Sequence, residues 1–368
     1  MKNVVFVHDH KLKMIDNFYY SNGAFNDSVF MNYYSISNNL TLYLRVYNYE
    51  NISSLGLTKI TKFTNLINSN NLKLKPFIKM IMNHDLFIIR LPSINGLIVY
   101  FIAKFLKKKM LIEVVGCTWD SLWNHSLVAK FAAPFLWLLS RIVIFNSTNV
   151  LYVTKYFLQK RYPTKGLAVS CSDVLIFNVT STDIDNRIQK IEYLKFNEIK
   201  IGTLASVNLK YKGHHTVFNA IKKLNTFGYY PKYYLAGSGS QNRLKRLAVR
   251  LGIINNVVFL GSLNRNNIVE FFNSIDLYIQ PSLVEALPRA LIEAMSLGLP
   301  CIGSNAGGIK ELLSKEYIFK KNRYKELVEI IRSLNKKSLI KASRDNIVKS
   351  NDFNESNLSS IRKKFYNS

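Results

Sequence analysis

The feature that most constrains the fold is a regular alternation of short apolar runs and helical stretches in the second half of the chain. Each run is long enough for one strand. Between the runs, apolar residues recur at helical spacing, as Val217, Ile221 and Leu224 do within His214–Leu224. Strands that alternate with helices form parallel sheets with helical crossovers. The pattern therefore predicts a doubly wound α/β sheet, in which ligands bind at the carboxyl ends of the strands.

The elements of this sheet can be placed along the chain. The predicted strands are Lys200–Ala205, Tyr233–Ala236, Val257–Leu260, Leu277–Ile279 and Pro300–Gly303. The predicted helices are His214–Leu224, Asn242–Leu251, Asn266–Asn273, one that starts at Pro288 and one opened by Gly307-Gly308.

The first half shows a weaker form of the same alternation. Val4–Val7 is predicted as a buried strand followed by a polar loop, and further apolar runs lie at Leu42–Val46, Asp85–Arg90 and Met110–Val115. A chain of 368 residues is long for one core and suits two domains. We therefore expect two Rossmann-like domains.

A polar segment separates the two halves. Ser, Thr, Asp and Asn cluster at Thr180–Asn186, which indicates an inter-domain connection. The predicted boundaries are an N-terminal domain over 1–170, a connector over 171–197 and a C-terminal domain over 198–345. The last segment, 346–368, is predicted as a helix that packs back towards the N-terminal domain, with Leu358, Ile361, Phe365 and Tyr366 at helical spacing.

Two carboxylates stand near a predicted helix start. Glu285 lies in the strand-to-helix loop, Pro288 suits the first helical turn, and Glu293 lies a turn or more inside the helix. Backbone amides from Leu287 to Ala290 would point out of the helix start and bind an anion. The two carboxylates could accept hydrogen bonds from sugar and ribose hydroxyls. Taken alone, the segment also suits an ordinary helix with two solvated glutamates.

Neighbouring loops favour the ligand site. Lys212-Gly213 follows the first strand of this domain, Gly237-Ser238-Gly239 follows the next strand, and Gly307-Gly308 follows the last. Glycines at strand ends let the backbone approach a ligand closely. Four loops with ligand-compatible residues on one sheet edge predict a site for a sugar attached to a diphosphate.

These blocks resemble the retaining GT-B glycosyltransferases of family 4. The resemblance covers almost all of 199–313 and rests on Ile201-Gly202, Lys212-Gly213, Leu235–Gly239, Val258–Gly261, Asp276–Ser282, the Glu-x7-Glu pair Glu285/Glu293 and Gly307-Gly308. In the first half it is looser, through Glu113–Gly116 with Trp119-Asp120, and Val153–Lys155 with Arg161–Pro163. The resemblance implies a GT-B fold, with a donor cleft between two Rossmann-like domains.

The resemblance also implies residue roles. Glu293 would bind the donor ribose, Glu285 would contact the transferred sugar, and Lys212 would neutralise the diphosphate. The implied catalytic residues are Glu285, Lys212 and His125; the implied donor-binding residues are Glu293, Ser206, Gly237, Gly239, Ser282, Leu287, Pro288, Arg289 and Gly23. No metal and no cofactor are expected, because fixed cations and a helix start can stabilise the leaving group.

The only Asp-x-Asp sequence, Asp183-Ile184-Asp185, falls in the connector and suits a solvated loop better than a Mg²⁺ site. One departure from the family pattern concerns the diphosphate. The family usually places an arginine six residues before the lysine of the Lys-Gly pair, where this chain has Ser206. Lys210 or Arg289 could supply the second cation.

In the N-terminal domain, the family uses a glycine-containing loop after the first strand and often a histidine near the sugar. Ser21–Ala24, which contains Gly23, is the predicted loop, although it lies far from Val7. His125 is preferred over His8 and His10 because it follows the block Glu113–Asp120; a structural role for this histidine is the alternative.

The chain is strongly basic, with 50 Lys and Arg against 23 Asp and Glu. A net charge of +27 favours polyanions such as nucleic acid, an anionic bilayer or phosphorylated substrates, although AT-rich coding would also raise the lysine content. Lysines gather beside Phe77, Phe101 and Phe105, namely Lys73, Lys75, Lys79, Lys104, Lys107, Lys108 and Lys109. Such a surface can dock on anionic lipid, or it is a solvated helix face.

Two apolar stretches are too interrupted to predict a membrane span. Leu97–Phe105 is broken by Lys104, and Leu127–Phe145 contains Lys130, Pro134 and Arg141. The three cysteines, Cys117, Cys171 and Cys301, are odd in number and far apart, which favours a reducing compartment. We expect a cytoplasmic protein, peripheral on the inner face of the plasma membrane.

The sequence thus predicts retaining transfer of a hexose or N-acetylhexosamine from a nucleotide-diphosphate sugar to a lipid-linked or polysaccharide acceptor in cell-surface glycan synthesis. The alternatives are a basic nucleic-acid-binding protein and a catalytically degenerate membrane-associated member of the family. Nucleic acid is not expected as a partner, because the sequence shows no zinc, helix-turn-helix or aromatic-basic RNA motif.

Overall fold

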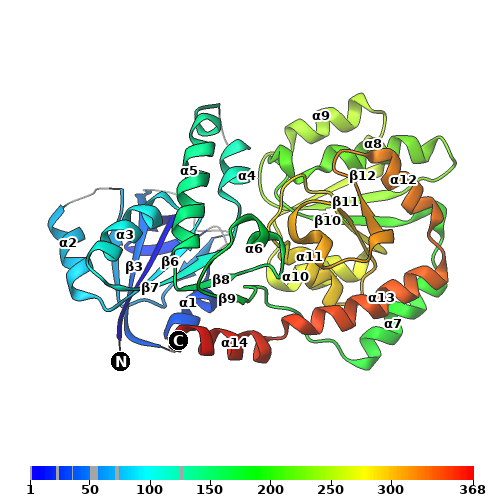
Figure 1. Cartoon of the computed structure of the whole chain (residues 1–368). Helices are drawn as coiled ribbons and strands as arrows, with labels where there is room; N and C mark the ends of the chain where they lie inside the picture. The colour runs from blue at the N-terminus through cyan, green and yellow to red at the C-terminus, as the bar shows by residue number, and fades with distance from the viewer. Residues whose placement is uncertain (1, 22–24, 35, 50–56, 71–73, 125–126) are drawn as a thin grey trace. The chain divides into compact units, whose positions relative to one another are not determined.

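The computed structural model describes residues 2–21, 25–34, 36–49, 57–70, 74–124 and 127–368 (Figure 1). The chain forms two compact units. Unit 1 comprises Met1–Asp173 and Ser356–Ser368, and unit 2 comprises Val174–Glu355. The last helix of the chain therefore belongs to the same unit as the N-terminal half.

Unit 1 is a mostly parallel sheet with helical crossovers. Its strands are β1 (Lys2–Ile15), β2 (Phe18–Ser21), β3 (Ser37–Asn48), β4 (Thr58–Ile60), β5 (Asn65–Asn68), β6 (Leu86–Leu91), β7 (Lys109–Val114), β8 (Asn149–Tyr152) and β9 (Leu167–Ser170). Its helices are α1 (Asp27–Tyr34), α2 (Leu74–Asn83), α3 (Ile94–Phe105), α4 (Thr118–Trp123), α5 (Leu127–Phe145), α6 (Phe157–Arg161) and α14 (Glu355–Asn367).

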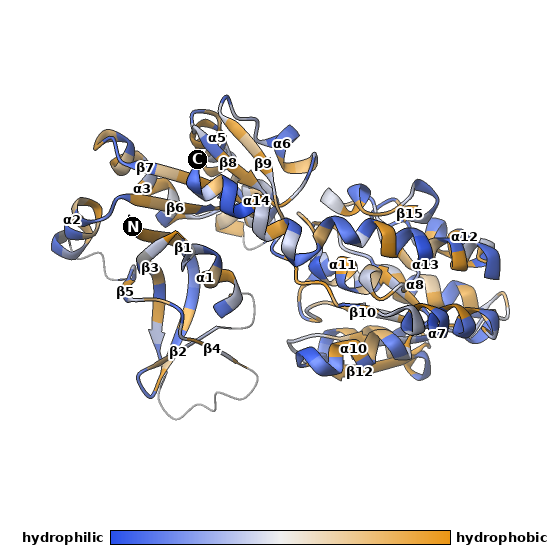
Figure 2. Cartoon of the chain, turned by 90° about the horizontal axis from the view of Figure 1, so that it is seen from below, coloured by the Kyte–Doolittle hydropathy of each residue, from blue (hydrophilic) through white to orange (hydrophobic). Residues whose placement is uncertain are grey.

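The central strands of this sheet are mostly apolar and are buried on both faces. Strands β5, β3, β1, β6, β7, β8 and β9 pair in parallel in that order, and every residue of β6 is buried. Burial on both faces is typical of a parallel sheet covered by helices. The orange colouring of β6 and β7 in Figure 2 reflects this composition.

The prediction for the first strand is wrong beyond Val7. Strand β1 continues through His8 and His10 to Ile15, then turns back into the antiparallel strand β2. Its register with β3 shifts between Val7 and Lys11, so the strand leaves the apolar sheet centre while keeping its backbone hydrogen bonds. This hairpin is the reason that Ser21, where the predicted glycine loop begins, lies so far from Val7 in sequence.

Unit 2 confirms the predicted α/β alternation. Its parallel sheet has the order β12-β11-β10-β13-β14-β15, with strands β10 (Lys200–Leu204), β11 (Lys232–Ala236), β12 (Val257–Gly261), β13 (Leu277–Gln280), β14 (Cys301–Ser304) and β15 (Ile318–Phe319). Its α-helices are α7 (Ser181–Glu192), α8 (His214–Asn225), α9 (Asn242–Arg250), α10 (Arg265–Ser274), α11 (Arg289–Ser296), α12 (Tyr324–Ser333) and α13 (Lys336–Ser350).

Two local predictions for unit 2 need correction. The polar cluster Thr180–Asn186 is the start of helix α7, where Thr180 and Asp183 cap each other's backbone amides. The Asp-x-Asp sequence therefore lies in a helical turn and not in a loop. Gly307-Gly308 opens the short 3₁₀ helix η4 (Gly307–Glu311) and not an α-helix.

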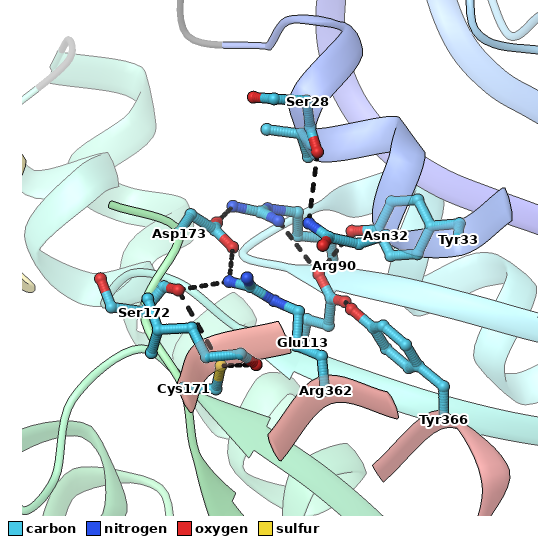
Figure 3. A network of polar contacts seen from close by, with 12 residues as sticks. Ser28, Asn32, Tyr33, Arg90, Glu113, Cys171, Ser172, Asp173, Arg362 and Tyr366 are labelled. Atoms are coloured by element: carbon cyan, nitrogen blue, oxygen red, sulfur yellow. Dashed lines mark hydrogen bonds and ion pairs between the residues drawn. The ribbon is translucent and has the colours of Figure 1, made fainter. Parts of the chain in front are cut away.

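A buried polar network joins α14 to the sheet of unit 1 (Figure 3). Asp173 accepts from Arg90 and from Arg362 of α14, the latter at 2.7 Å. Glu113 of β7 accepts from Arg90 at 3.0 Å, and the hydroxyls of Tyr33 and Tyr366 donate to its two oxygens at 2.9 and 2.6 Å. Glu113 is 2% exposed, so each of its contacts is shielded from water.

Helix α5 is less interrupted than the sequence predicts. It runs without interruption through Pro134, and it is the one helix among the described residues that is long and apolar enough to cross a membrane, by length and composition alone. The interruptions seen in the sequence therefore do not shorten it. Phe77 differs as well, since its side chain is buried and cannot contribute to a basic amphipathic surface.

Candidate active site

In unit 2, the loops that follow β10, β11, β13 and β14 are bound to one another through their backbones. The Val207 amide donates to the Ser238 carbonyl at 3.0 Å, which ties the loop after β10 to the glycine turn after β11. The Leu283 amide donates to the Tyr211 carbonyl at 2.7 Å, and the Gly308 amide donates to the Ala286 carbonyl at 2.7 Å. The four loops predicted from sequence therefore form one continuous rim at the carboxyl edge of the sheet.

The centre of this rim is an ion pair between Lys212 and Glu285. Their side chains come from the 3₁₀ helix η2 (Lys210–Lys212) and from the loop after β13, and Lys212 Nζ lies 2.9 Å from Glu285 Oε2. Burial lowers the pKa of Lys212, but the Glu285 carboxylate outweighs it, so the pKa lies above its ordinary value. The rim therefore holds a cation that stays charged at neutral pH.

Two glycines fix the position of this pair. Gly213 has φ of +75°, and a Cβ on it would lie 1.9 Å from the Pro281 carbonyl oxygen. Gly307 has φ of +49°, and its Cβ would lie 1.7 Å from the Glu285 carbonyl oxygen. Neither position admits a side chain without moving backbone. The glycines thus let η2 and the loop after β14 approach the Glu285 loop closely.

Glu293 lies on α11, on the same rim. Its side chain is partly buried, and burial raises its pKa, while the charges of Arg289 and Arg265 act in the opposite direction. No hydrogen bond or ion pair to its carboxylate joins it to any described residue. A partly buried carboxylate near two arginines, with its oxygens uncommitted, can accept hydrogen bonds from a ligand.

The remaining predicted donor residues differ in whether their polar groups already make hydrogen bonds within unit 2. Pro288 caps α11, and Arg289 begins it, so the first-turn amides lack intrahelical acceptors, as expected. Ser206 Oγ lies 3.0 Å from the Ser238 carbonyl oxygen and 2.7 Å from Asn208 Oδ1. Ser282 is fully buried, and its hydroxyl accepts from Gln280 at 2.8 Å. Ser282 thus holds the loop, and its backbone carbonyl accepts from the Ser304 hydroxyl.

The glycine turn lies where the sequence places it. Gly237 and Gly239 both have positive φ, and a Cβ on them would lie 2.0 Å from the Ala205 carbonyl oxygen and 2.6 Å from the Asn208 side chain. Leu287 is partly exposed in the loop that leads to α11.

Sequence reasoning missed one residue on the rim, His214. Its ring contacts the Ser206 carbonyl at 3.2 Å and the Tyr233 hydroxyl at 3.3 Å. Burial lowers its pKa to about 4, so the imidazole is neutral at pH 7 and braces the loop at Ser206. The signal was the His214-His215 pair directly after Lys212-Gly213, but the sequence did not show which histidine points inward.

Only some of the residues predicted for the site in unit 1 are described by the structure. Gly23 and His125 lie outside the described residues. His10 contacts the Ser21 hydroxyl at 2.8 Å, and the rings of His8 and His10 pack against Phe25. Burial and the charge of Arg90 lower the pKa of both histidines, that of His10 to about 4.

The two loosely matching blocks of the first half meet in space. Arg161, at the end of α6, forms an ion pair with Asp120 of α4 at 3.1 Å. The Tyr162 hydroxyl accepts from the Thr118 amide at 2.9 Å.

The cysteines Cys117, Cys171 and Cys301 are free and buried. Among the described residues, no group of three or more His, Cys, Asp or Glu side chains could hold a metal ion.

The chain is similar to known proteins both in unit 2 and over nearly its whole length. The family model of glycosyl transferases group 1 matches residues 186–351, which contain the whole rim. The protein CapJ of Staphylococcus aureus is 31% identical over 374 residues, which cover 98% of this chain and 93% of CapJ.

Solved structures match the fold over the full length. Sucrose-phosphate synthase from Thermosynechococcus elongatus superposes with a TM-score of 0.70 at 14% identity, covering 100% of this chain and 98% of that one. Anabaena HepE in complex with UDP and glucose superposes with a TM-score of 0.65 at 16% identity, covering 100% and 99%. A relative at this identity over nearly the whole chain, together with the family match, shows that the chain belongs to the group 1 glycosyltransferases and has their GT-B fold.

Proposed function

We propose that this glycosyltransferase moves a hexose or N-acetylhexosamine from a nucleotide-diphosphate sugar to a lipid-linked or polysaccharide acceptor in cell-surface glycan synthesis, with retention at the anomeric carbon. The observation that carries the proposal is the rim of unit 2, where the Lys212–Glu285 pair and the uncommitted Glu293 carboxylate follow strands β10 and β13 at the carboxyl edge of the sheet. Lys212 would supply the positive charge for a diphosphate. Glu285 and Glu293 would accept hydrogen bonds from the hydroxyls of a sugar and a ribose.

The Lys212–Glu285 ion pair would provide both a cation for the diphosphate and a carboxylate for the sugar in the proposed reaction. Without a ligand, Glu285 neutralises Lys212 at 2.9 Å. A donor diphosphate would compete for Lys212 and free Glu285 to accept hydrogen bonds from sugar hydroxyls. Lys212 would then stabilise the negative charge that grows on the β-phosphate oxygen as the glycosidic bond breaks. That oxygen would accept the proton of the attacking hydroxyl, on the same face of the sugar.

Arg289 is the better candidate for the second cation. Its charge acts on both Lys212 and Glu293, so it lies near the two groups that would flank the diphosphate and the ribose. Lys210 and Arg289 are both exposed, so the effect of the Arg289 charge on Lys212 and on Glu293 is what favours Arg289. With Lys212, Arg289 and the first-turn amides of α11, the leaving group would need no metal ion.

The acceptor side of the proposal rests on unit 1. Exposed lysines such as Lys75, Lys79 and Lys104 favour peripheral contact with anionic lipid on the cytoplasmic face of the plasma membrane. A polyprenyl- or lipid-linked saccharide would be presented at that surface.

The proposal is tested by product analysis. Purified protein is incubated with nucleotide-diphosphate hexoses and N-acetylhexosamines, a lipid-linked saccharide acceptor, and either EDTA or Mg²⁺. We expect transfer from one donor, a product with the anomeric configuration of that donor by NMR coupling constants, and an equal rate in EDTA. An inverted anomer, or loss of activity in EDTA, would contradict the proposed mechanism.

A further inference from the structure

Helix α5 presents an apolar stripe to solvent. Six large side chains at helical spacing are exposed: Leu127 (74%), Val128 (80%), Phe131 (88%), Phe135 (64%), Leu138 (50%) and Ile142 (44%). Only 22% of the most apolar window of the helix is buried. The core helix of a soluble protein would be mostly buried, and a contiguous exposed apolar stripe marks an interaction surface.

Helix α3 extends this surface, because α3 and α5 pack against each other. Its exposed apolar residues also recur every three or four positions, at Ile94 (45%), Ile98 (40%), Phe101 (43%) and Phe105 (85%). We call these four residues and the six of α5 the α3–α5 face.

All three tryptophans of the chain stand beside this face, on α4 and α5. The rings of Trp119 and Trp123 stack at 5.2 Å, and Trp137 meets Trp119 edge-on at 6.2 Å. Trp123 is 45% exposed. Tryptophan is enriched where protein meets the boundary between lipid headgroups and acyl chains.

The charge around the face is mostly positive, and Asp120 of α4 is paired with Arg161. No Asp or Glu occurs between Asp85 and Glu113, or between Asp120 and Asp173. Lys130 lies over the Trp123 ring and Arg141 over the Trp137 ring, at 5.7 and 5.4 Å. Two copies of the chain that met through this face would bring like charges together, whereas anionic headgroups would neutralise them.

The packing of α5 argues against insertion across a bilayer. Ala133, Ser140, Val143 and Ile144 on its opposite side are at most 1% exposed, so the helix cannot detach from the unit without exposing its core. A helix with one face in a protein core and one apolar face in solvent lies along a membrane surface.

We propose that the α3–α5 face docks unit 1 on an anionic bilayer, with α5 in the interface plane and Phe131 and Phe135 among the acyl chains. The inference rests on the proposed membrane contact of the transferase and names the surface that makes it. The surface would keep the enzyme beside a lipid-linked acceptor.

The test uses the full-length protein and vesicles of phosphatidylglycerol mixed with phosphatidylcholine. We expect co-sedimentation that weakens with added salt, and a blue shift of tryptophan emission, because every tryptophan lies beside the face. The double variant Phe131→Ser/Phe135→Ser is expected to partition about tenfold or more weakly, since two phenyl rings no longer leave water. The matched control is Tyr193→Ser/Val348→Ser in unit 2, where the side chains are 80% and 70% exposed; it should bind like the wild type.

Absence of vesicle binding at low salt, or equal binding by the two double variants, would overturn the inference. A dimer of the wild type that the Phe131→Ser/Phe135→Ser variant loses would assign the face to a second copy, and would also overturn it. Transfer to a short-chain soluble acceptor, measured without vesicles, separates this inference from the proposed function. Vesicle binding without transfer from any donor would contradict the proposed function alone. Transfer without vesicle binding would contradict the docking surface alone.

Discussion

Lys212→Ala is expected to lower the rate of sugar transfer by about 10²–10³-fold, the usual loss when one fixed stabiliser of transition-state charge is removed. Lys212 Nζ lies 2.9 Å from Glu285 Oε2 and would meet the diphosphate when a donor displaces that contact. The variant leaves the Glu285 carboxylate as an unneutralised charge on the rim, so repulsion between it and the diphosphate adds to the loss. The measurement is the single-turnover rate with saturating donor.

Lys210→Ala is the matched control, because Lys210 lies in the same 3₁₀ helix but is exposed. We expect its rate to stay within about twofold of the wild type, since an exposed charge is screened by solvent. Melting temperatures of both variants separate lost chemistry from lost fold. Equal rates in Lys212→Ala and the wild type would show that the diphosphate binds elsewhere.

The second large effect concerns stability and not chemistry. Glu113→Ala is expected to destabilise unit 1 by about 3–5 kcal/mol, because it breaks a buried pair with Arg90 and removes the acceptor of two buried tyrosine hydroxyls. Those hydroxyls, of Tyr33 and Tyr366, have raised pKa values, mainly through burial, and therefore stay protonated donors at neutral pH. Chemical denaturation of the full chain, followed by circular dichroism, measures the loss.

The matched control for this experiment is Asp345→Ala, which removes the exposed partner of Lys341 four residues earlier on α13. Its unfolding midpoint should not change, because surface pairs contribute little. A Glu113→Ala protein as stable as the wild type would mean that the network in Figure 3 does not hold α14 on the sheet.

Local patterns in the sequence predicted most of unit 2. Strands β10 to β14 are short apolar runs, and α8 and α9 carry apolar residues at one helical period, so each element is determined by its own residues. The apolar strands β3, β6 and β7 of unit 1 were found for the same reason.

The failures have two physical causes, which are pairing with other strands and the use of the same residue types in helix caps and in loops. The stretch His8–Lys11 is polar and gives no strand signal, and β1 continues past it because β2 and β3 provide hydrogen-bond partners for Lys11–Ile15. The start of α7 resembled a linker because capping residues and loop residues are the same types, Thr and Asp in this case.

The site shows the same division. Glu285, Lys212 and the glycine turns could be placed from spacing, because strand ends of one sheet share an edge. The inward hydroxyl of Ser282 and the inward ring of His214 depend on side-chain directions that only the packed loops determine. The Lys212–Glu285 contact joins residues 73 positions apart and was visible in sequence only as two charges near one edge.

The central claim is that the rim of unit 2 binds a nucleotide-diphosphate sugar through Glu293 and its neighbours. Thermal shift against a panel of UDP-, GDP- and ADP-sugars tests it most directly, because a ligand that binds the folded state raises the melting temperature by mass action. We predict that one nucleotide class stabilises the wild type and that Glu293→Ala, which removes the proposed ribose acceptor, abolishes the shift without lowering the melting temperature of the free protein. A panel in which no nucleotide sugar stabilises the wild type, or in which Glu293→Ala responds like the wild type, would contradict the claim.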